Sequence, residues 1–269
     1  MSRLQNTLAE LKAAGRAALI PYITAGDPDI DTTLDLMHEL VAAGADVIEL
    51  GVPFSDPMAD GPTIQLAYER ALKHGVGLRD VLALVARFRA RDNRTPVVLM
   101  GYMNPIEYMG YETFVNASVE AGIDGVLVVD LPPEECETLT GMLHERELDT
   151  IFLLTPTTSD ERARAICAHS SGYVYYVSIK GVTGANTLDV DNVKHHVERL
   201  RQATELPIAV GFGIKTAADA AAVSRVADGV IVGSALVNII AQAADRPAVE
   251  ITSQVSALLS DMRNGMDAA

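Results

Sequence analysis

Short apolar segments recur along the chain and alternate with longer stretches that have helical spacing. The apolar segments lack the strict alternation of a half-exposed strand, which is typical of parallel strands buried on both faces. Strands are therefore predicted at 19–24, 46–50, 97–101, 125–129, 150–153, 174–178, 208–210 and 229–232. Between them, apolar residues recur every three or four positions, as at Leu34, Met37 and Val41, and predict amphipathic helices.

This succession of strand–helix units predicts an α/β fold, a single (β/α)8 TIM barrel over residues 1–269. The chain has 269 residues, 49% of them hydrophobic, which suits one barrel of about 250 residues. Leu4, Leu8 and Leu11 predict an extra N-terminal helix beneath the barrel. Extra helices are also expected in the loops after strand two, at 63–73, and after strand eight. The polar end, 264–269, is expected to be disordered.

A doubly wound open sheet is the main alternative fold. Such a sheet binds nucleotides at a glycine-rich turn that follows its first strand. Here that turn reads Ala25-Gly26-Asp27-Pro28 and lacks the fingerprint. The barrel is therefore the favoured architecture.

Composition narrows the function. The chain has 36 acidic and 21 basic residues, a net charge of −15, which argues against nucleic acid and membrane partners because both require basic surfaces. Cys136 and Cys167 lack the C-x-x-C spacing of a zinc or redox site and indicate a reducing compartment. With no signal-peptide core and no apolar run of roughly 18 residues, a cytoplasmic protein is expected. The histidines fall in predicted helices or at their ends, so no metal site is expected.

Two carboxylates mark a candidate catalytic site. Glu49 stands at the end of predicted strand 46–50, and Asp60 follows in a proline-rich loop. In barrels, active sites lie at this carboxyl end of the strands. A glutamate in an apolar pocket has a raised pKa and suits general acid–base catalysis, whereas an aspartate in an open loop stays ionised. A structural alternative remains for each: Glu49 could pair with a barrel lysine, and Asp60 could cap the following helix.

Glycines after the last two predicted strands indicate a phosphate site. Gly213 follows strand seven, and Gly233 and Ser234 follow strand eight and open a helix. Barrels bind phosphate there because free backbone N–H groups and the helix dipole converge. Gly184 belongs to a third glycine pair, in the loop after strand six, which is predicted to act as a lid. Each pair taken alone is also compatible with an ordinary turn.

Five motifs give the chain a family resemblance. They are PYITAGDP at 21–28, ELGVPFSDP at 49–57, ADGP at 59–62, GVTG at 181–184 and GFGI at 211–214. Together they resemble the tryptophan synthase alpha subunit. The resemblance implies a carbon–carbon lyase that cleaves indole-3-glycerol phosphate to indole and D-glyceraldehyde 3-phosphate, with Glu49 and Asp60 as its catalytic residues. It also implies no cofactor in this chain, and a partner beta subunit that carries pyridoxal phosphate in an alpha2-beta2 heterotetramer.

The indole ring of such a substrate needs an apolar slot at the barrel mouth. Strand ends and nearby loops supply the expected substrate-binding residues: Tyr22, Met100, Leu127, Tyr175, Thr183 and Phe212. Tyr175 and Phe212 match substrate-contacting positions of the family, and the Tyr175 hydroxyl is also expected to assist proton transfer. The chain departs from the family at Tyr22, where phenylalanine is frequent, and at Ile179, where arginine is common; Lys180 follows it.

Two other function classes remain open at this point. Another phosphate-binding barrel isomerase would share the phosphate loops but does not need Glu49 paired with Asp60. A ligand-binding subunit that mainly activates a partner is the non-catalytic alternative. The loop at 53–58, joined directly to Asp60, is the expected docking site for the beta subunit.

Overall fold

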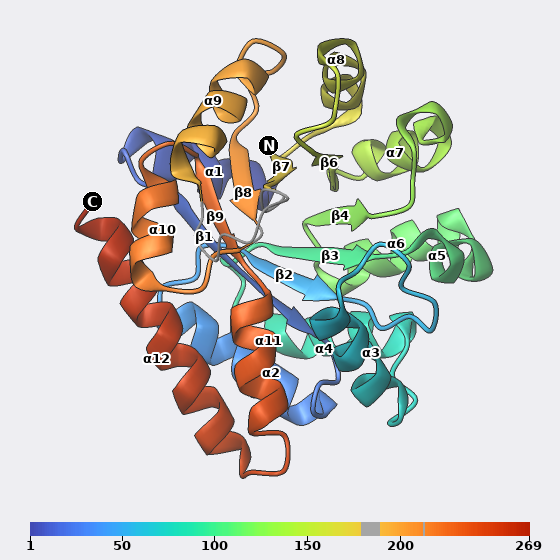
Figure 1. Cartoon of the computed structure of the whole chain (residues 1–269). Helices are drawn as coiled ribbons and strands as arrows, with labels where there is room; N and C mark the ends of the chain where they lie inside the picture. Colours follow the sequence, from blue (N-terminus) through green and yellow to red (C-terminus); the bar gives the residue numbers. More distant parts are fainter. Residues whose placement is uncertain (179–188, 212) are drawn as a thin grey trace.

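The structure, a computed structural model, describes residues 1–178, 189–211 and 213–269 (Figure 1). Over these residues, nine strands form one parallel sheet in the order β5-β4-β3-β2-β1-β9-β8-β7-β6. The strands are β1 (Ala18–Thr24), β2 (Ile48–Gly51), β3 (Val97–Gly101), β4 (Gly125–Val128), β5 (Asp149–Ile151), β6 (Leu153–Leu154), β7 (Val174–Val177), β8 (Ile208–Gly211) and β9 (Gly229–Val232). The sheet curves on itself, and helices surround it (Figure 1).

The barrel closes through a strand that is divided in two. Only Phe152 separates β5, which pairs with β4, from β6, which pairs with β7. The Tyr175 N–H donates to the Phe152 carbonyl at 3.0 Å, so the pairing with β7 continues across the division. The predicted (β/α)8 TIM barrel is therefore confirmed, with its fifth strand observed as two short segments.

Helices cover the outside of the barrel. In the described chain they are α1 (Arg3–Ala13), α2 (Ile30–Ala42), α3 (Pro62–Leu72), α4 (Leu78–Arg89), α5 (Met103–Met109), α6 (Tyr111–Ala121), η1 (Pro133–Glu135), α7 (Glu137–Glu145), α8 (Asp160–His169), α9 (Val190–Leu200), α10 (Ala217–Ser224), α11 (Ser234–Gln242) and α12 (Ala248–Asp267). The predicted extra helices are present as α1 before the first strand, α3 after β2 and α11 after β9.

One further helix, α5, occupies the loop after β3, where the sequence pattern predicts none. Pro105 lies in its first turn, where the missing N–H of proline removes no helical hydrogen bond. Asp130 Oδ1 accepts the Met103 N–H at 2.8 Å and satisfies a donor that the helix itself leaves free. A contact from the loop after β4 therefore supports this short helix.

The C-terminal end is ordered. Helix α12 continues to Asp267, so the expected disorder of 264–269 is wrong. Met266 is buried, and Asp267 forms ion pairs with Arg16 and with Arg263. Burial of Met266 and the long-range pair with Arg16 therefore order a last turn whose polar composition is typical of a disordered end.

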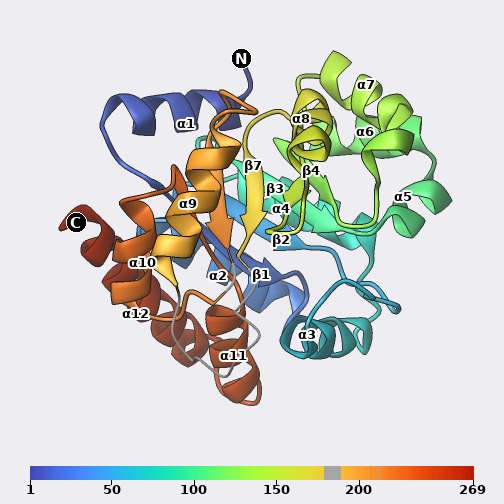
Figure 2. The same cartoon turned by 45° about the horizontal axis from the view of Figure 1, so that its top comes forward.

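The amino-terminal end of the barrel is closed by α1. Leu4, Leu8 and Leu11 belong to the apolar cluster inside the barrel, together with Val47 and Val98 from the starts of β2 and β3. Figure 2 shows α1 lying across this end of the barrel. The predicted position of the N-terminal helix is confirmed, and the carboxyl ends of the strands are left as the open mouth.

A buried charge cluster ties α1 and α4 to the same closed end. The carboxylate of Asp124, at the start of β4, pairs with Arg89 at 2.7 Å and with Arg3, and it accepts the Val97 N–H at 2.8 Å.

No helix in the described part of the chain is long and apolar enough to cross a membrane.

Candidate active site

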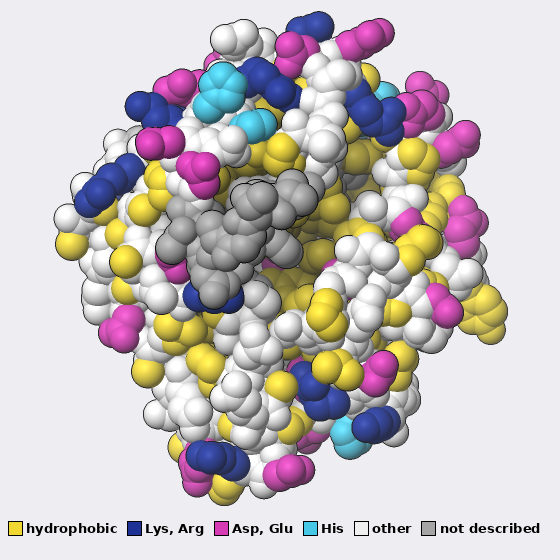
Figure 3. Space-filling model, in the orientation of Figure 1, with side chains coloured by type: hydrophobic (Ala, Val, Ile, Leu, Met, Phe, Trp, Pro, Cys, Tyr) yellow, Lys and Arg dark blue, Asp and Glu magenta, His cyan; other side chains and the backbone are white. Residues whose placement is uncertain are grey.

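Side chains at the carboxyl ends of the strands build the mouth of the barrel. Glu49 on β2 and Tyr22 on β1 are partners in the β1–β2 register, and both are buried. Met100 packs against Tyr22 and also against the inner cluster, which includes Leu127 and, at its edge, Tyr175. These four predicted slot residues therefore lie around Glu49. Figure 3 shows a hollow with a hydrophobic floor in the middle of this face.

Glu49 has the environment of a proton-transfer group. Its side chain is 0% exposed, and Tyr173 donates its hydroxyl to Oε1 at 2.5 Å. Oε2 is buried and has no hydrogen-bond partner among the described residues. Burial raises the pKa of Glu49 from 4.5 to about 7, and the Tyr173 hydrogen bond offsets part of that rise. Within the described ranges no lysine or arginine pairs with this carboxyl group, so the alternative in which Glu49 pairs with a barrel lysine is not observed there.

Tyr173 is a residue that sequence reasoning missed. The predicted strand begins one residue later, at Val174, so Tyr173 falls outside it. Tyr173 and Tyr175 are separated by two positions, and alternation along an extended chain places both toward the barrel interior. That spacing was the available signal. The structure assigns the contact with Glu49 to the deeper tyrosine.

Asp60 is held by Tyr102, the residue that follows β3. The Tyr102 hydroxyl donates to Asp60 Oδ2 at 2.6 Å and accepts the Ala59 N–H at 3.1 Å, while its ring stacks on Phe54 with centroids 5.0 Å apart. Burial raises the pKa of Asp60, and the Tyr102 hydrogen bond opposes that rise. The N-cap of α3 is Gly61, without a side-chain cap bond, so the alternative role of Asp60 as helix cap is wrong.

The predicted phosphate residues lie at the ends of two paired strands. Gly213 follows β8 with φ 84°, in the left-handed region that favours glycine. Gly233 follows β9 and is the N-cap of α11, which begins at Ser234 and has no side-chain cap. Because β8 and β9 pair, the two turns lie at adjacent strand ends. Among the described residues no N-cap side chain bonds the first backbone N–H groups of α11, and such groups suit the binding of an anion.

Two glycines make room for the tyrosines of the mouth. A Cβ atom at Gly51 would lie 2.1 Å from the Tyr22 hydroxyl, and one at Gly211 would lie 2.3 Å from the Tyr175 hydroxyl. Each ring therefore lies directly over the backbone of a neighbouring strand.

Five residues named from the sequence lie outside the described residues: Thr183, Gly184, Phe212, Ile179 and Lys180.

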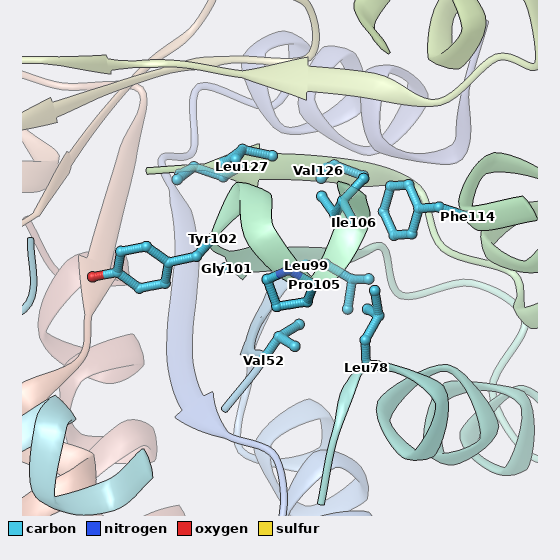
Figure 4. Close-up of a pocket in the computed structure, with 11 residues that line it drawn as sticks. Val52, Leu78, Leu99, Gly101, Tyr102, Pro105, Ile106, Phe114, Val126 and Leu127 are labelled. Atoms are coloured by element: carbon cyan, nitrogen blue, oxygen red, sulfur yellow. The ribbon is translucent and has the colours of Figure 1, made fainter. Parts of the chain in front are cut away.

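A small apolar cavity behind the mouth is not a second site. It lies between β3, β4 and the helices outside them, and Leu99, Phe114 and Val126 line it (Figure 4). Its volume is about 10 Å³, room for roughly one water molecule. Tyr102 borders it, but its hydroxyl points away (Figure 4). The cavity is thus a gap in the outer packing layer, and the barrel mouth remains the candidate site.

A parallel barrel with a buried carboxyl group of near-neutral pKa at its carboxyl-terminal mouth has the form of a TIM-barrel enzyme. A family model of the tryptophan synthase alpha chain matches residues 8–267. The chain is 60% identical over 267 residues to the tryptophan synthase alpha chain of Marinobacter nauticus, covering 99% of this chain and 98% of the relative. It is 59% identical to that of Thioalkalivibrio sulfidiphilus, covering 99% and 100%.

Solved structures agree. The tryptophan synthase subunit alpha of Legionella pneumophila superposes with a TM-score of 0.92 at 48% identity, over 100% of both chains. A tryptophan synthase structure from Mycobacterium tuberculosis, in an aminoacrylate-bound form, gives 0.87 at 36% identity over 99% of this chain and 100% of the other. The chain belongs to the tryptophan synthase alpha chain family.

Membership of this family makes the chain a carbon–carbon lyase of tryptophan biosynthesis, which carries out the cleavage of indole-3-glycerol phosphate. These matches do not favour the other two classes, a different barrel isomerase or a purely activating subunit. An alpha chain also implies a beta-subunit partner.

Proposed function

We propose that cleavage takes place at the barrel mouth, with Glu49 as general acid and base and Asp60 as the anion that binds the indole N–H. The burial of Glu49 supports its role most directly, because a pKa of about 7 keeps both protonation states populated near neutral pH. The hydrogen bond from Tyr102 supports the role of Asp60, because it opposes the rise in pKa that burial of Asp60 causes.

The reaction balances with these two groups. Protonated Glu49 donates its proton to C3 of the indole ring, and the positive charge that develops at the ring nitrogen is stabilised by Asp60. The Glu49 carboxylate then accepts the proton of the hydroxyl on the carbon attached to C3. The bond between that carbon and C3 breaks, its electron pair returns to the ring, and an aldehyde forms on the departing fragment. Glu49 ends protonated, as it began.

The substrate is proposed to lie with its ring in the apolar slot and its phosphate at the last two strand ends. Tyr22, Met100, Leu127 and Tyr175 line the slot. Thr183 and Phe212 are proposed as further slot residues from their places in the sequence after predicted strands, and Phe212 also from the family resemblance. The phosphate is proposed to bind Gly213, Gly233 and Ser234, with Gly184 added on the same resemblance.

The decisive experiment is indole release by the isolated chain. Purified protein, treated with chelator and without added pyridoxal phosphate, should convert indole-3-glycerol phosphate to indole and glyceraldehyde 3-phosphate in equal amounts. This also tests the proposal that the chain itself needs no cofactor. A lack of both products, with the protein folded, would contradict the proposed function.

The phosphate site is tested by Gly233→Ala. A Cβ at this position would lie 3.7 Å from Tyr22 Cβ, an ordinary contact, so the variant should fold. An added methyl group at the N-cap of α11 should hinder the approach of a phosphate to the first N–H groups of the helix and weaken hydrogen bonds to a charged group, raising KM by about tenfold or more. Gly141→Ala on α7, where a Cβ meets no atom within 4 Å, is the control. Equal KM values in the two variants would place the phosphate elsewhere. Gly213 is a poorer target, because its positive φ adds backbone strain.

We further propose that the beta subunit, with its pyridoxal phosphate, docks on the carboxyl-terminal face to form an alpha2-beta2 heterotetramer. Met58 and Tyr108 support this surface, since they are 78% and 94% exposed on the loop before α3 and on α5.

Free, buried Cys136 and Cys167 support a reducing, cytoplasmic location. A single sheet running through the chain supports one domain over 1–269.

Communication with the partner is tested at Asp56. Its side chain is exposed, and the one hydrogen bond found for it among the described residues is accepted from the neighbouring Ser55 hydroxyl, at 2.6 Å. Asp56→Ala should therefore leave the rate of the isolated chain nearly unchanged and reduce the rise caused by added beta subunit. Asp261→Ala, an exposed carboxylate on α12, is the control. If the rate of indole release fell by the same factor with and without the partner, Asp56 would serve local structure only.

A further inference from the structure

Tyr22 lies between the two ends of the proposed substrate site. Its Cα pairs in register with that of Glu49, and the base of its side chain lies beside Gly233, at the N-terminus of α11. Its hydroxyl reaches over Gly51, two residues beyond Glu49 on β2. The ring therefore spans the barrel wall from the phosphate helix to the strand that carries the proposed general acid.

The Tyr22 hydroxyl joins a buried chain of three hydroxyl groups. It hydrogen-bonds to Thr24 Oγ1 at 3.2 Å and donates to the Tyr68 hydroxyl at 3.3 Å. All three side chains are at most 3% exposed. A buried hydroxyl without a partner is costly, so these three groups satisfy one another. Removing one of them changes the contacts of the others.

Tyr68 belongs to the helix that follows the Asp60 loop. Helix α3 begins at Pro62, two residues after Asp60, and its N-cap makes no side-chain hydrogen bond. Gln65, in the first turn, donates its side-chain amide to the backbone carbonyls of Asp60 at 2.8 Å and Pro57 at 3.3 Å, so the Asp60 loop is tied to the start of α3. The position of α3 itself is set by its packing on the barrel. That packing includes an apolar cluster of Tyr22, Ala67 and Val237, and the hydrogen bond from Tyr22 to Tyr68.

A second polar contact, two residues further along, holds the C-terminal half of α3. Arg70 donates two hydrogen bonds to the buried carboxylate of Asp27, at 2.7 and 2.8 Å, in the loop after β1. Both polar contacts thus tie α3 to the same strand and its loop. The Arg70–Asp27 pair ties α3 to that loop, whereas the Tyr22–Tyr68 hydrogen bond ties α3 to the barrel wall next to Glu49.

We propose that the Tyr22 hydroxyl is a positioning group that fixes α3, through Tyr68, and thereby sets the place of Asp60 relative to Glu49. The inference rests on the proposed roles of the two acids. A phenylalanine at position 22 would retain the apolar wall of the slot and lose the hydrogen bonds to Tyr68 and Thr24. The hydroxyl therefore contributes to turnover without contacting the reacting atoms.

The test compares Tyr22→Phe, Tyr68→Phe and the double variant in steady-state cleavage of indole-3-glycerol phosphate. Each single variant should lower kcat by about twofold to tenfold, the value of one hydrogen bond, with KM changed less than about twofold. The double variant should be no slower than the slower single variant, because both remove the same contact. Tyr176→Phe is the control, since this buried hydroxyl has no partner among the described residues.

The pH–rate profile separates this role from a direct effect on the general acid. Tyr22 and Glu49 are register neighbours, so a hydroxyl that acted on Glu49 would shift the limb near pH 7 when removed. An unshifted limb with lowered kcat supports positioning through α3. A shifted limb, additive losses in the double variant, a change in KM alone, or an unchanged kcat in both single variants would each overturn the inference. Failure of the proposed function is distinct, because the unsubstituted chain would then release no indole.

Discussion

Glu49→Gln should lower the rate of indole release by about 100-fold to 10,000-fold, the range typical for loss of a general acid–base group. Glutamine keeps the shape of the side chain and can still contact the Tyr173 hydroxyl, but it neither donates a proton to C3 nor accepts one from the substrate. Binding of the glyceraldehyde 3-phosphate product should change little. The measurement is kcat for the isolated chain and for the chain with beta subunit. Glu120→Gln, an exposed glutamate on α6, is the matched control.

The same variant reports the raised pKa through its stability. A carboxyl group whose pKa rises from 4.5 to about 7 on folding contributes stability that is full below pH 4.5 and is lost as the pH rises through 7. The difference corresponds to about 3 kcal/mol when the group is fully ionised. Urea unfolding should therefore show the Gln variant gaining stability relative to the parent between pH 5 and pH 8. An identical difference at both pH values would mean that Glu49 has an ordinary pKa, and retained turnover would remove its role in proton transfer.

Asp124→Asn should cost about 3 to 5 kcal/mol of unfolding free energy, the usual effect of breaking a buried ion pair. The Asp124 carboxylate is 5% exposed and its partner Arg89 is 9% exposed, so the substitution leaves a buried guanidinium without its counter-charge. Arg89 cannot move to water easily, because it also donates to the carbonyls of Gly122 and Thr95. The measurement is urea unfolding, with a corresponding fall in Tm.

An exposed ion pair supplies the control for that prediction. Arg87 and Asp31 also lie 2.7 Å apart, but their side chains are 48% and 81% exposed. Asp31→Asn should cost less than about 1 kcal/mol, because water screens such pairs. Asp124 lies at the closed end of the barrel, so kcat of the folded Asn variant should be close to that of the parent. Equal stability losses at the two positions would show that burial does not determine the value of the Asp124 pair.

Much of the architecture was predictable because parallel strands in a barrel are buried on both faces. That burial requires uninterrupted apolar runs, and such runs are visible in sequence. Glu49 stands out because it interrupts this pattern at a strand end. The divided fifth strand was not predictable, because the pairing of β5 and β6 with different neighbours depends on how the barrel closes around Phe152.

Other features depended on contacts that no local pattern contains. Helix α5 is supported by Asp130 from another loop, and the last turn of α12 is held by Arg16 from the other end of the chain. Tyr68 looked like an ordinary helix residue, and only its hydrogen bond with Tyr22 gives it a relation to the site. Each of these misses concerns a stabilising partner that is distant in sequence.

By itself, the sequence determined the strand positions, the acid at the end of β2 and the glycine turns after β8 and β9, because each depends on residue type and spacing within one strand–loop unit. Only the tertiary structure decided how those groups behave. The near-neutral pKa of Glu49 comes from removal of water by the whole barrel, and its partner Tyr173 lies 124 positions away. Asp60 likewise depends on Tyr102, 42 positions further along the chain. Desolvation and long-range hydrogen bonding exist only after the barrel has closed, so no local pattern encodes them.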